Sequence, residues 1–480
     1  MPVPSSSRSH DAGVTDMPHH LVTMIDSNLE EEQYDGALDL LDQLRSRNYR
    51  PPPQLVYMSL LPVALVEKKQ NEQIGPASPT KAARRIRAPA LPPAEAIHRA
   101  RRLLFSFSAT NTPEQLFSAL PGYHTSVSLS ALDDDDIYSM IGKAALSILE
   151  CKDCWAFLIE DFTNRRLSAF ASPKKGKGRR ASTRNVTNGD EPSNVDPDEQ
   201  PKFVGKESWD VLEWLVDLLE RDQEQTKEAG CLPFSRLLLT QIPLPRASGI
   251  TPWETDAPLN IVFYCLEQVE ERRARVGLRL MTLLVNLAAA GQIDANIFST
   301  AVVARLAAQP ADLLSQFFAG LSASAGIARF KVAVCRNLLA GAKQTTKAPR
   351  PKPQARARPR TSNVSKAASS NIAPAEPKEA ESAMPRSEPL PLPETSELLQ
   401  LVEQTAYDKH LLSSEDAAYR VKFELLCSYA YLQGQLFGDG SWARALADNS
   451  VGRAVNAVFG QHQTGTGYRD VLVCVLRLTA

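Results

Sequence analysis

The sequence has too few and too scattered cysteines for a disulfide framework. Seven cysteines are spread over 480 residues, and several lie inside apolar helical patterns. Small secreted domains that depend on disulfides carry dense, even-numbered cysteine sets instead. We therefore expect reduced thiols and an intracellular location.

Long hydrophobic runs are also missing. The longest apolar run, 278–290, contains Arg279 and Asn286 and is shorter than the about 20 residues that cross a bilayer as a helix. Residues 1–20 lack the apolar core of a secretory signal, and their aspartates argue against a mitochondrial presequence. The sequence predicts no membrane segment.

Catalytic signatures are absent as well. The sequence contains no Gly-x-x-x-x-Gly-Lys-Ser/Thr loop, no glycine-rich dinucleotide motif, no Gly-x-Ser-x-Gly elbow and no His-Glu-x-x-His. The one metal-like spacing is Cys151-Lys152-Asp153-Cys154. A structural zinc site would need a second pair of ligands, and these two cysteines lie in an apolar helical pattern where they share one face. We expect no enzyme activity, no cofactor and no metal.

Neither sign of charge is in excess, and proline outnumbers glycine. Lys and Arg number 54 and Asp and Glu 55, which gives a net charge of −1 and excludes a uniformly basic nucleic-acid binder. The 34 prolines, against 23 glycines, crowd into stretches without apolar periodicity. This pattern is typical of ordered blocks that are separated by disordered links.

Helical periodicity is the clearest positive signal. Apolar residues recur at i, i+3, i+4 and i+7 in several segments, as on the buried face of an amphipathic helix. The best examples are Ala37, Leu40, Leu41 and Leu44; Val211, Leu212, Leu215, Leu218 and Leu219 after a predicted Ser208 cap; and Leu425, Leu426, Tyr429, Leu432 and Leu436 after a predicted Ser414 cap. No strand alternation extends beyond a few residues, although 471–480 fits a strand or a helix. The predicted fold class is all-α, with helical-repeat-like or bundle blocks separated by disordered linkers.

Composition and periodicity together divide the chain into eight segments. They are a disordered N-terminus (1–18), a helical hairpin (19–70), a linker (71–92), a helical block (93–172), a disordered basic and acidic loop (173–207), a helical bundle (208–342), a disordered basic, Pro-rich linker (343–393) and a C-terminal helical block (394–480). In the hairpin, Pro51 to Pro53 end one helix and a second helix is expected from Gln54. Residues 259–290 form two consecutive helices or one long one, with a charged middle in which Arg272 is expected to serve binding and not folding.

Two basic clusters are the main candidate site residues. Both lie in predicted disordered segments, where they are available to an importin groove or to a phosphate backbone. The first consists of Lys174, Lys175, Lys177, Arg179 and Arg180, and the second of Lys343, Lys347, Arg350, Lys352, Arg356, Arg358 and Arg360. A merely solubilising role is the alternative. We prefer nuclear import for at least one cluster.

Three serines near basic residues are candidate phosphorylation sites. Ser78 and Ser172 each begin a Ser-Pro-x-Lys sequence, which resembles sites of cyclin-dependent kinases. Ser182 follows Arg179-Arg180-Ala181, which resembles a basophilic-kinase site. Phosphate beside a basic cluster would cancel local charge and could switch import or DNA contact.

Residues 35–51, DGALDLLDQLRSRNYRP, resemble the second helix and tail of a tetratricopeptide or pentatricopeptide unit. The resemblance implies a helical hairpin. Repeat arrays stack several units to build a core, and this pattern occurs once in the chain. The RNA-reading code of the pentatricopeptide family is therefore not carried over.

A longer stretch resembles the helical dimerisation domain of telomere repeat-binding factors. The resemblance rests on the helix that ends before Pro51, on Ala94-Glu95-Ala96-Ile97, and on residues 142–148 (GKAALSI) leading to 154–158 (CWAFL). It implies a domain that dimerises and docks short peptides. The chain lacks a Myb-like domain at its C-terminus, so telomeric DNA recognition is not implied.

These observations favour a non-enzymatic nuclear adaptor or scaffold that binds partner proteins through helical surfaces, in a chromatin, telomere or DNA-maintenance complex. The alternative is a helical-repeat protein that binds nucleic acid through its basic linkers. An adaptor could also make weak nucleic-acid contact through the same linkers. A third class, an enzyme on a helical scaffold with paired carboxylates such as Glu160 and Asp161, stays open.

Overall fold

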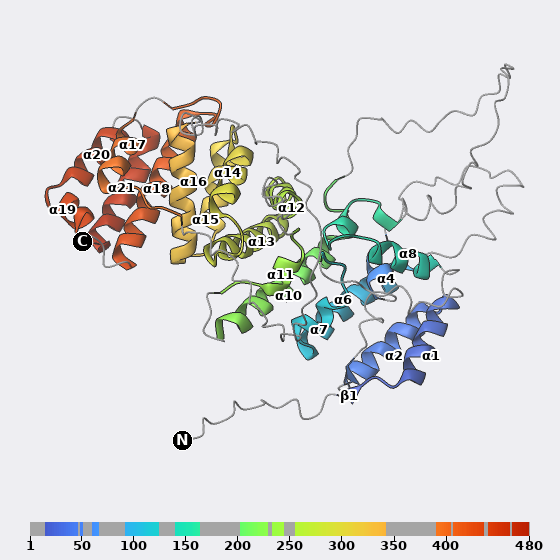
Figure 1. Ribbon diagram of the computed structural model, residues 1–480. Helices are drawn as coiled ribbons and strands as arrows, with labels where there is room; N and C mark the ends of the chain where they lie inside the picture. The colour runs from blue at the N-terminus through green and yellow to red at the C-terminus, as the bar shows by residue number, and fades with distance from the viewer. Residues whose placement is uncertain are drawn as a thin grey trace, which may run out of the picture. The chain divides into compact units, whose positions relative to one another are not determined.

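The structure is a computed structural model of the 480-residue chain, and its described parts are helical (Figure 1). It describes residues 15–46, 49–50, 60–66, 92–123, 140–163, 202–228, 233–243, 255–341, 390–404, 407–435, 440–460 and 463–479. The predicted all-α class is confirmed. None of the helices in these ranges combines the length and the hydropathy that crossing a membrane requires.

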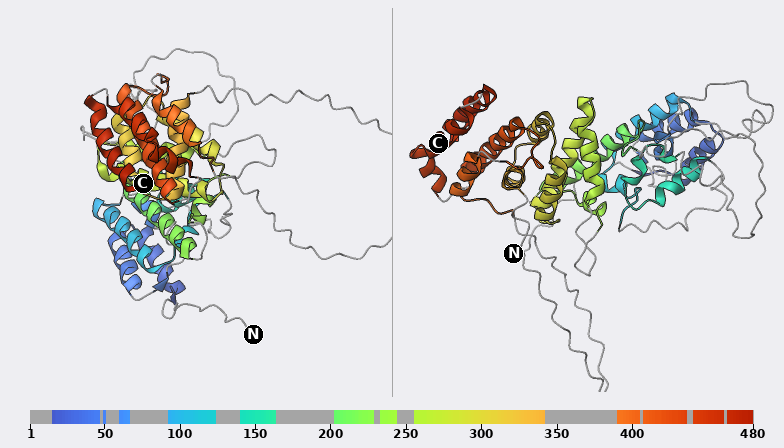
Figure 2. Two further views of the ribbon diagram at one scale, coloured as in Figure 1. Left: turned by 90° about the vertical axis from the view of Figure 1, so that its left-hand side faces the viewer. Right: turned by 90° about the horizontal axis from the view of Figure 1, so that it is seen from above.

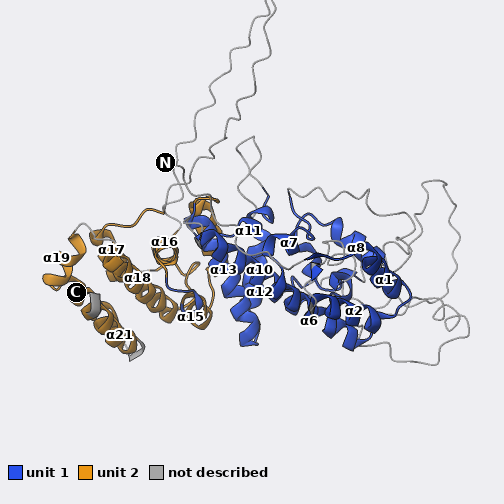
Figure 3. Ribbon diagram, turned by 90° about the horizontal axis from the view of Figure 1, so that it is seen from below, with its two compact units in different colours: residues 1–290, 319–323 blue, residues 291–318, 324–480 orange. Residues whose placement is uncertain are grey.

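Two compact units divide the chain (Figure 3). Unit 1 comprises residues 1–290 and 319–323, and unit 2 comprises residues 291–318 and 324–480. The border at Ala290 and Gly291 lies inside the block predicted over 208–342. The helices of that block are therefore shared between the two units.

Unit 1 begins with a short parallel strand pair and a helical hairpin. β1 (Thr15–Asp16) pairs with β2 (Tyr49–Arg50), and α1 (His19–Glu30) packs against α2 (Tyr34–Ser46). The remaining helices are α4 (Leu61–Ala64), α6 (Ala94–Thr110), α7 (Pro113–Phe117), α8 (Met140–Leu149), the 3₁₀ helix η4 (Ala156–Leu158), α10 (Trp209–Glu228), α11 (Arg236–Thr240), α12 (Asp256–Leu266) and α13 (Glu271–Ala289).

The long helix α10 organises unit 1 because its apolar face is fully buried. All five residues of its predicted stripe are buried, and so is Trp214. The Trp214 indole N–H donates to the Ser108 hydroxyl of α6 at 2.8 Å. Arg221 of α10 donates to the carbonyls of Ser108 and Asn111, where the C-terminus of α6 favours a cation. The buried Trp214 and the hydrogen bonds from Arg221 to the end of α6 thus join α6 and α10.

Unit 2 is built around α16 (Ala325–Ala340) and α18 (Glu415–Gln435), which pack closely. The other helices are α14 (Ala295–Leu306), α15 (Ala311–Gly320), α17 (Thr395–Glu403), α19 (Ser441–Ala447), α20 (Ser450–Phe459) and α21 (Gln463–Thr479). α21 packs against α18 and α20, and α20 also packs against α17 and α19; Figure 2 shows these C-terminal helices in orange to red. The Ser414 hydroxyl accepts from the Ala417 N–H at 3.1 Å, which confirms the predicted cap of α18. The C-terminal segment, open between strand and helix, is helical.

The structure corrects the edges of three predicted disordered segments and adds a partner to the hairpin. α2 packs against α1, whereas residues 51–59, where the second helix is predicted to begin, lie outside the described ranges, so that helix stays a prediction. Residues 15–18 include the strand β1 and a buried Met17. Residues 390–393 include a buried Leu390 and a Pro393 carbonyl that accepts from the Tyr429 hydroxyl at 3.2 Å. Residues 202–207 are structured as well.

Candidate protein-interaction surface

α10 and α13 of unit 1 run parallel, and a ladder of polar pairs joins them. Arg272 binds Glu213 and Asp210, Arg279 binds Asp217 and Glu220, and Asn286 donates to Gln223 at 3.0 Å. The α13 members are spaced by seven residues, and their partners on α10 advance in the same direction. Because seven residues are close to two helical turns, the three α13 members lie on one face of α13 and face their partners on α10.

Arg279 forms the strongest rung of this ladder. Its Nε and Nη2 donate to the two carboxylate oxygens of Glu220 at 2.9 and 2.5 Å, a bidentate geometry. The hydrogen bond to Glu220 raises the pKa of Arg279. Arg272 also belongs to the ladder, but its side chain is 66% exposed, and its expected role in binding stays a prediction.

Beside the ladder, four side chains from three segments form a continuous stack, here called the aromatic stack. The Arg273 guanidinium lies 4.7 Å from the centre of the Trp209 ring, and that ring stacks on Tyr264 with centres 6.0 Å apart and planes at 13°. Phe203 meets Tyr264 edge-on at 6.1 Å. Stacked rings and a cation over an indole are favourable geometries. The four side chains therefore form one continuous row of packed groups.

The outer end of the stack and one residue of the turn between α12 and α13 are apolar and face solvent. Phe203 is 43% exposed, and Val269, in the turn between α12 and α13, is fully exposed. Around Val269, Gln268 donates to the Tyr264 carbonyl at 3.0 Å and Glu270 pairs with Arg273 at 3.0 Å. The Val269 side chain therefore stands on a turn whose flanks are held by hydrogen bonds.

The segment that carries Phe203 is anchored to the end of η4. The Gly205 N–H donates to the Leu158 carbonyl at 2.8 Å, and the Glu160 N–H donates to the Lys202 carbonyl at 3.1 Å. The Lys202 ammonium pairs with the Glu160 carboxylate at 3.2 Å. Glu160, considered above as one of a catalytic carboxylate pair, thus binds a lysine of this segment.

The Cys151 to Cys154 sequence forms a turn and not a helix, which corrects the helical interpretation. α8 ends at Leu149, and the Asp153 carboxylate accepts from the N–H groups of Trp155 and Ala156 at 3.1 Å. The Cys154 N–H donates to the Gln241 side chain at 2.7 Å. Burial raises the pKa of the Cys154 thiol well above its usual range.

Cys151 and Cys154 are buried side chains that pack in the interior of unit 1. The six cysteines in the described ranges are thiols, and within those ranges no three His, Cys, Asp or Glu side chains gather as metal ligands would. A buried thiol with a raised pKa is a poor nucleophile.

Every residue proposed from the sequence as a site lies outside the described residues. This holds for the two basic clusters and for the three serines: Lys174, Lys175, Lys177, Arg179, Arg180, Lys343, Lys347, Arg350, Lys352, Arg356, Arg358, Arg360, Ser78, Ser172 and Ser182. Their roles stay predictions.

Sequence reasoning missed the aromatic stack entirely. Its members are separated by as many as 70 positions, between Phe203 and Arg273, and share no periodicity. The one available signal was Val269, an apolar residue beside the charged run that begins at Glu270. Such a residue in a polar turn is a candidate contact.

Compared with protein-family models, curated proteins and solved structures, the chain matches none of them. The likenesses to tetratricopeptide units and to telomere repeat-binding factors stay predictions from the sequence.

Proposed function

We propose that this protein is a non-enzymatic adaptor or scaffold subunit of a nuclear complex and that it binds partner proteins through surfaces of its helices. The observation that carries the proposal is the aromatic stack with the exposed Val269 beside it. Tyr, Trp and Arg dominate the binding energy of protein interfaces when they are held rigidly and surrounded by apolar contacts. A chromatin, telomere or DNA-maintenance complex is the setting we favour, on the sequence resemblances and basic clusters alone.

The energetics favour a protein partner. Val269 and the outer edge of Phe203 are hydrated in the isolated chain. Burying a Val or Phe side chain contributes about 1.5–3 kcal/mol. The ring stack is already ordered through Tyr264 and Trp209, so a partner would immobilise few side chains on this face. A partner with an apolar pocket for Val269 fits the surface best.

The test is a comparison of partners retained by matched variants of the full chain. Val269→Asp puts a carboxylate at the exposed position of the turn between α12 and α13, whereas Val471→Asp makes the same change at a half-exposed position of α21. Substitutions at such exposed sites change the free energy of unfolding by roughly 0.5 kcal/mol or less. Both variants should therefore fold.

Quantitative mass spectrometry of affinity-purified complexes from nuclear extract reads out the result. We expect a set of proteins that the unchanged chain and Val471→Asp retain and that Val269→Asp loses. Equal retention by all three proteins would refute the aromatic stack as the binding surface.

A further inference from the structure

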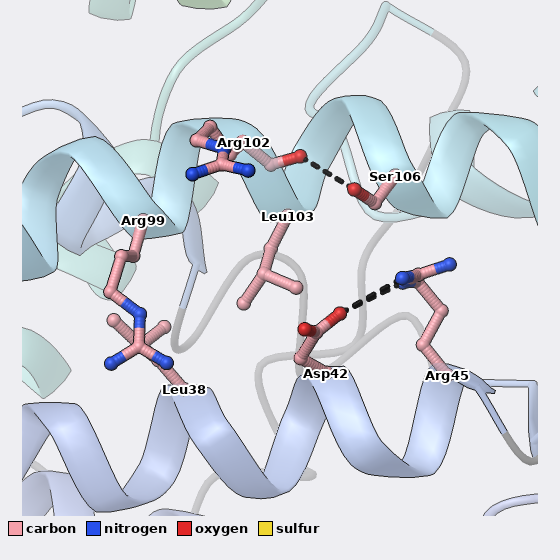
Figure 4. A pocket seen from close by; sticks show the side chains of 7 residues that line it. All are labelled: Leu38, Asp42, Arg45, Arg99, Arg102, Leu103 and Ser106. Carbon is pink, nitrogen blue, oxygen red and sulfur yellow. Dashed lines mark hydrogen bonds and ion pairs between the residues drawn. The ribbon is translucent and has the colours of Figure 1, made fainter.

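α2 and α6 of unit 1 lie side by side and enclose an open cavity of about 310 Å³ (Figure 4). The lining side chains are Leu38, Asp42, Arg45, Arg99, Arg102, Leu103 and Ser106. Leu38 and Leu103 are buried and form an apolar floor. Three arginines and one carboxylate are in the lining, and Asp35 and Asp39 beside it pair with Arg99.

The three guanidinium groups differ in their ion-pair partners. Arg45 pairs with Asp42 one helical turn away at 2.9 Å, and Arg99 pairs with Asp39 of α2. Both aspartates are more than half exposed, and exposed ion pairs of this kind are weak because water screens them. A ligand with more than one negative charge can therefore compete for both arginines.

Arg102 is the third arginine, and its side chain is exposed. The backbone carbonyl of Arg102 accepts from the Ser106 hydroxyl at 3.0 Å. Its guanidinium makes no ion pair with the described residues. Arg102 thus brings a planar set of donors to the cavity without an opposing carboxylate.

We propose that this cavity binds a phosphate-bearing side chain of a partner peptide, with Arg102 and Arg99, one turn apart on α6, as the groups that bind the phosphoryl oxygens. Guanidinium groups recognise phosphate by paired, charge-assisted hydrogen bonds. The proposal rests on the adaptor function and names the chemistry of one partner segment.

A nucleic-acid backbone fits this surface less well than one phosphoryl group. Asp35, Asp39 and Asp42 follow one another along α2, and they are 65%, 57% and 54% exposed. A row of phosphates laid along the helix would meet all three carboxylates, and like charges repel at such distances. A single phosphate between the arginines avoids them.

The experiment measures retention of the full chain on immobilised peptide libraries. The first library has one fixed central phosphoserine between degenerate flanks, and the other two have serine or glutamate at that position. We expect retention on the phosphoserine library and little on the serine library. Arg102→Gln should weaken this binding about tenfold or more, since a hydrogen bond to a charged group is lost.

Two further variants separate recognition from folding. Arg275→Gln changes an exposed arginine of α13 that pairs with Glu271 and does not line the cavity, so it should bind as the unchanged chain does. Asp42→Asn removes the competing carboxylate and should tighten binding several-fold. A purely structural role for these residues predicts no tightening.

The remaining outcomes each decide the matter. Equal retention on the serine and phosphoserine libraries would overturn the proposal. A second result would also overturn it. If the unchanged chain binds a labelled 20-nucleotide RNA or DNA but no phosphopeptide, and Arg102→Gln loses the nucleic-acid binding, then the cavity contacts a nucleic acid. Val269→Asp leaves the cavity intact and should still bind the phosphoserine library, so this proposal and the aromatic-stack proposal fail separately.

Discussion

At the scale of single residues, the buried carboxylate of Asp222 joins α10 to α11. One of its oxygens accepts from the Ser235 hydroxyl at 2.6 Å and from the Leu237 N–H at 2.9 Å. Burial raises the pKa of Asp222. In the folded protein, the carboxyl group therefore protonates at a higher pH than in the unfolded chain.

This shift has a defined sign for stability. Below the unfolded pKa the group is protonated in both states and costs nothing, and as the pH rises through the raised folded pKa the folded state loses stability. Asp222→Asn keeps an acceptor oxygen for both bonds and does not titrate. Its free energy of unfolding, relative to the unchanged protein, should rise between pH 4 and pH 7 in urea titrations. A difference that is constant with pH would contradict the buried, titrating carboxylate.

Leu283 tests the packing of α13. The side chain is 1% exposed, so Leu283→Ala should lower the free energy of unfolding by about 2–5 kcal/mol. Ala289→Asp, at an exposed position of the same helix, should cost less than about 1.5 kcal/mol. Thermal and urea unfolding followed by circular dichroism measures both. Equal small losses would show that α13 is not core.

The sequence predicted which side chains of α10 are buried, but not which side chains form ion pairs. The stripe of α10 is buried as its spacing predicts, because 3.6-residue periodicity directly encodes a buried face. The ion pair of Arg272 could not be predicted, because nothing in its own helix indicates that Glu213 of another helix lies within reach. Long-range ion pairs leave no mark in local sequence.

At the scale of elements, the ladder between α10 and α13 is expected to be cooperative. A double-mutant cycle on Arg279→Ala and Glu220→Ala should give a coupling energy of about 0.5–1.5 kcal/mol, since this half-buried pair is bidentate. The exposed pair Arg275 and Glu271 within α13 is the matched control and should give about 0.3 kcal/mol. Coupling in Arg279 and Glu220 no larger than in the control would mean that the ladder does not hold the helices.

Element boundaries were harder to predict than element type. α8 ends before Cys151 although no proline or glycine interrupts the sequence there. The turn is held by Asp153 and by the Gln241 side chain, 87 positions after Cys154. The hairpin helix α1 was missed because only Ile25 and Leu29 on it are buried, which is too sparse a stripe to detect.

At the scale of the whole molecule, the nuclear setting rests on the first basic cluster. We expect a fluorescent fusion of the full chain to accumulate in the nucleus and neutralisation of Lys174, Lys175, Arg179 and Arg180 to reduce the nuclear fraction. Importin grooves bind such cationic segments by charge. Arg275→Gln controls for the loss of a surface arginine. Unchanged localisation after neutralising this cluster and the 343–360 cluster together would contradict the import role.

The all-α class followed from periodicity alone, whereas the candidate surfaces did not. The aromatic stack and the arginine cavity each combine side chains from segments that are far apart in sequence. The basic clusters are visible in composition because they are contiguous. Contiguous features are therefore the ones that the sequence revealed, and surfaces assembled by folding required the structure.

The most direct test of the central claim is photo-crosslinking from position 269 in living cells. A photoreactive amino acid replaces Val269 in one protein and Val471 in another, and covalent adducts are resolved by mass. The account predicts adducts with other polypeptides from position 269, few from position 471, and their loss from position 269 when Phe203→Ala removes the end of the stack. Absence of adducts at position 269, or equal yields at both positions, would contradict a protein-binding role for this surface.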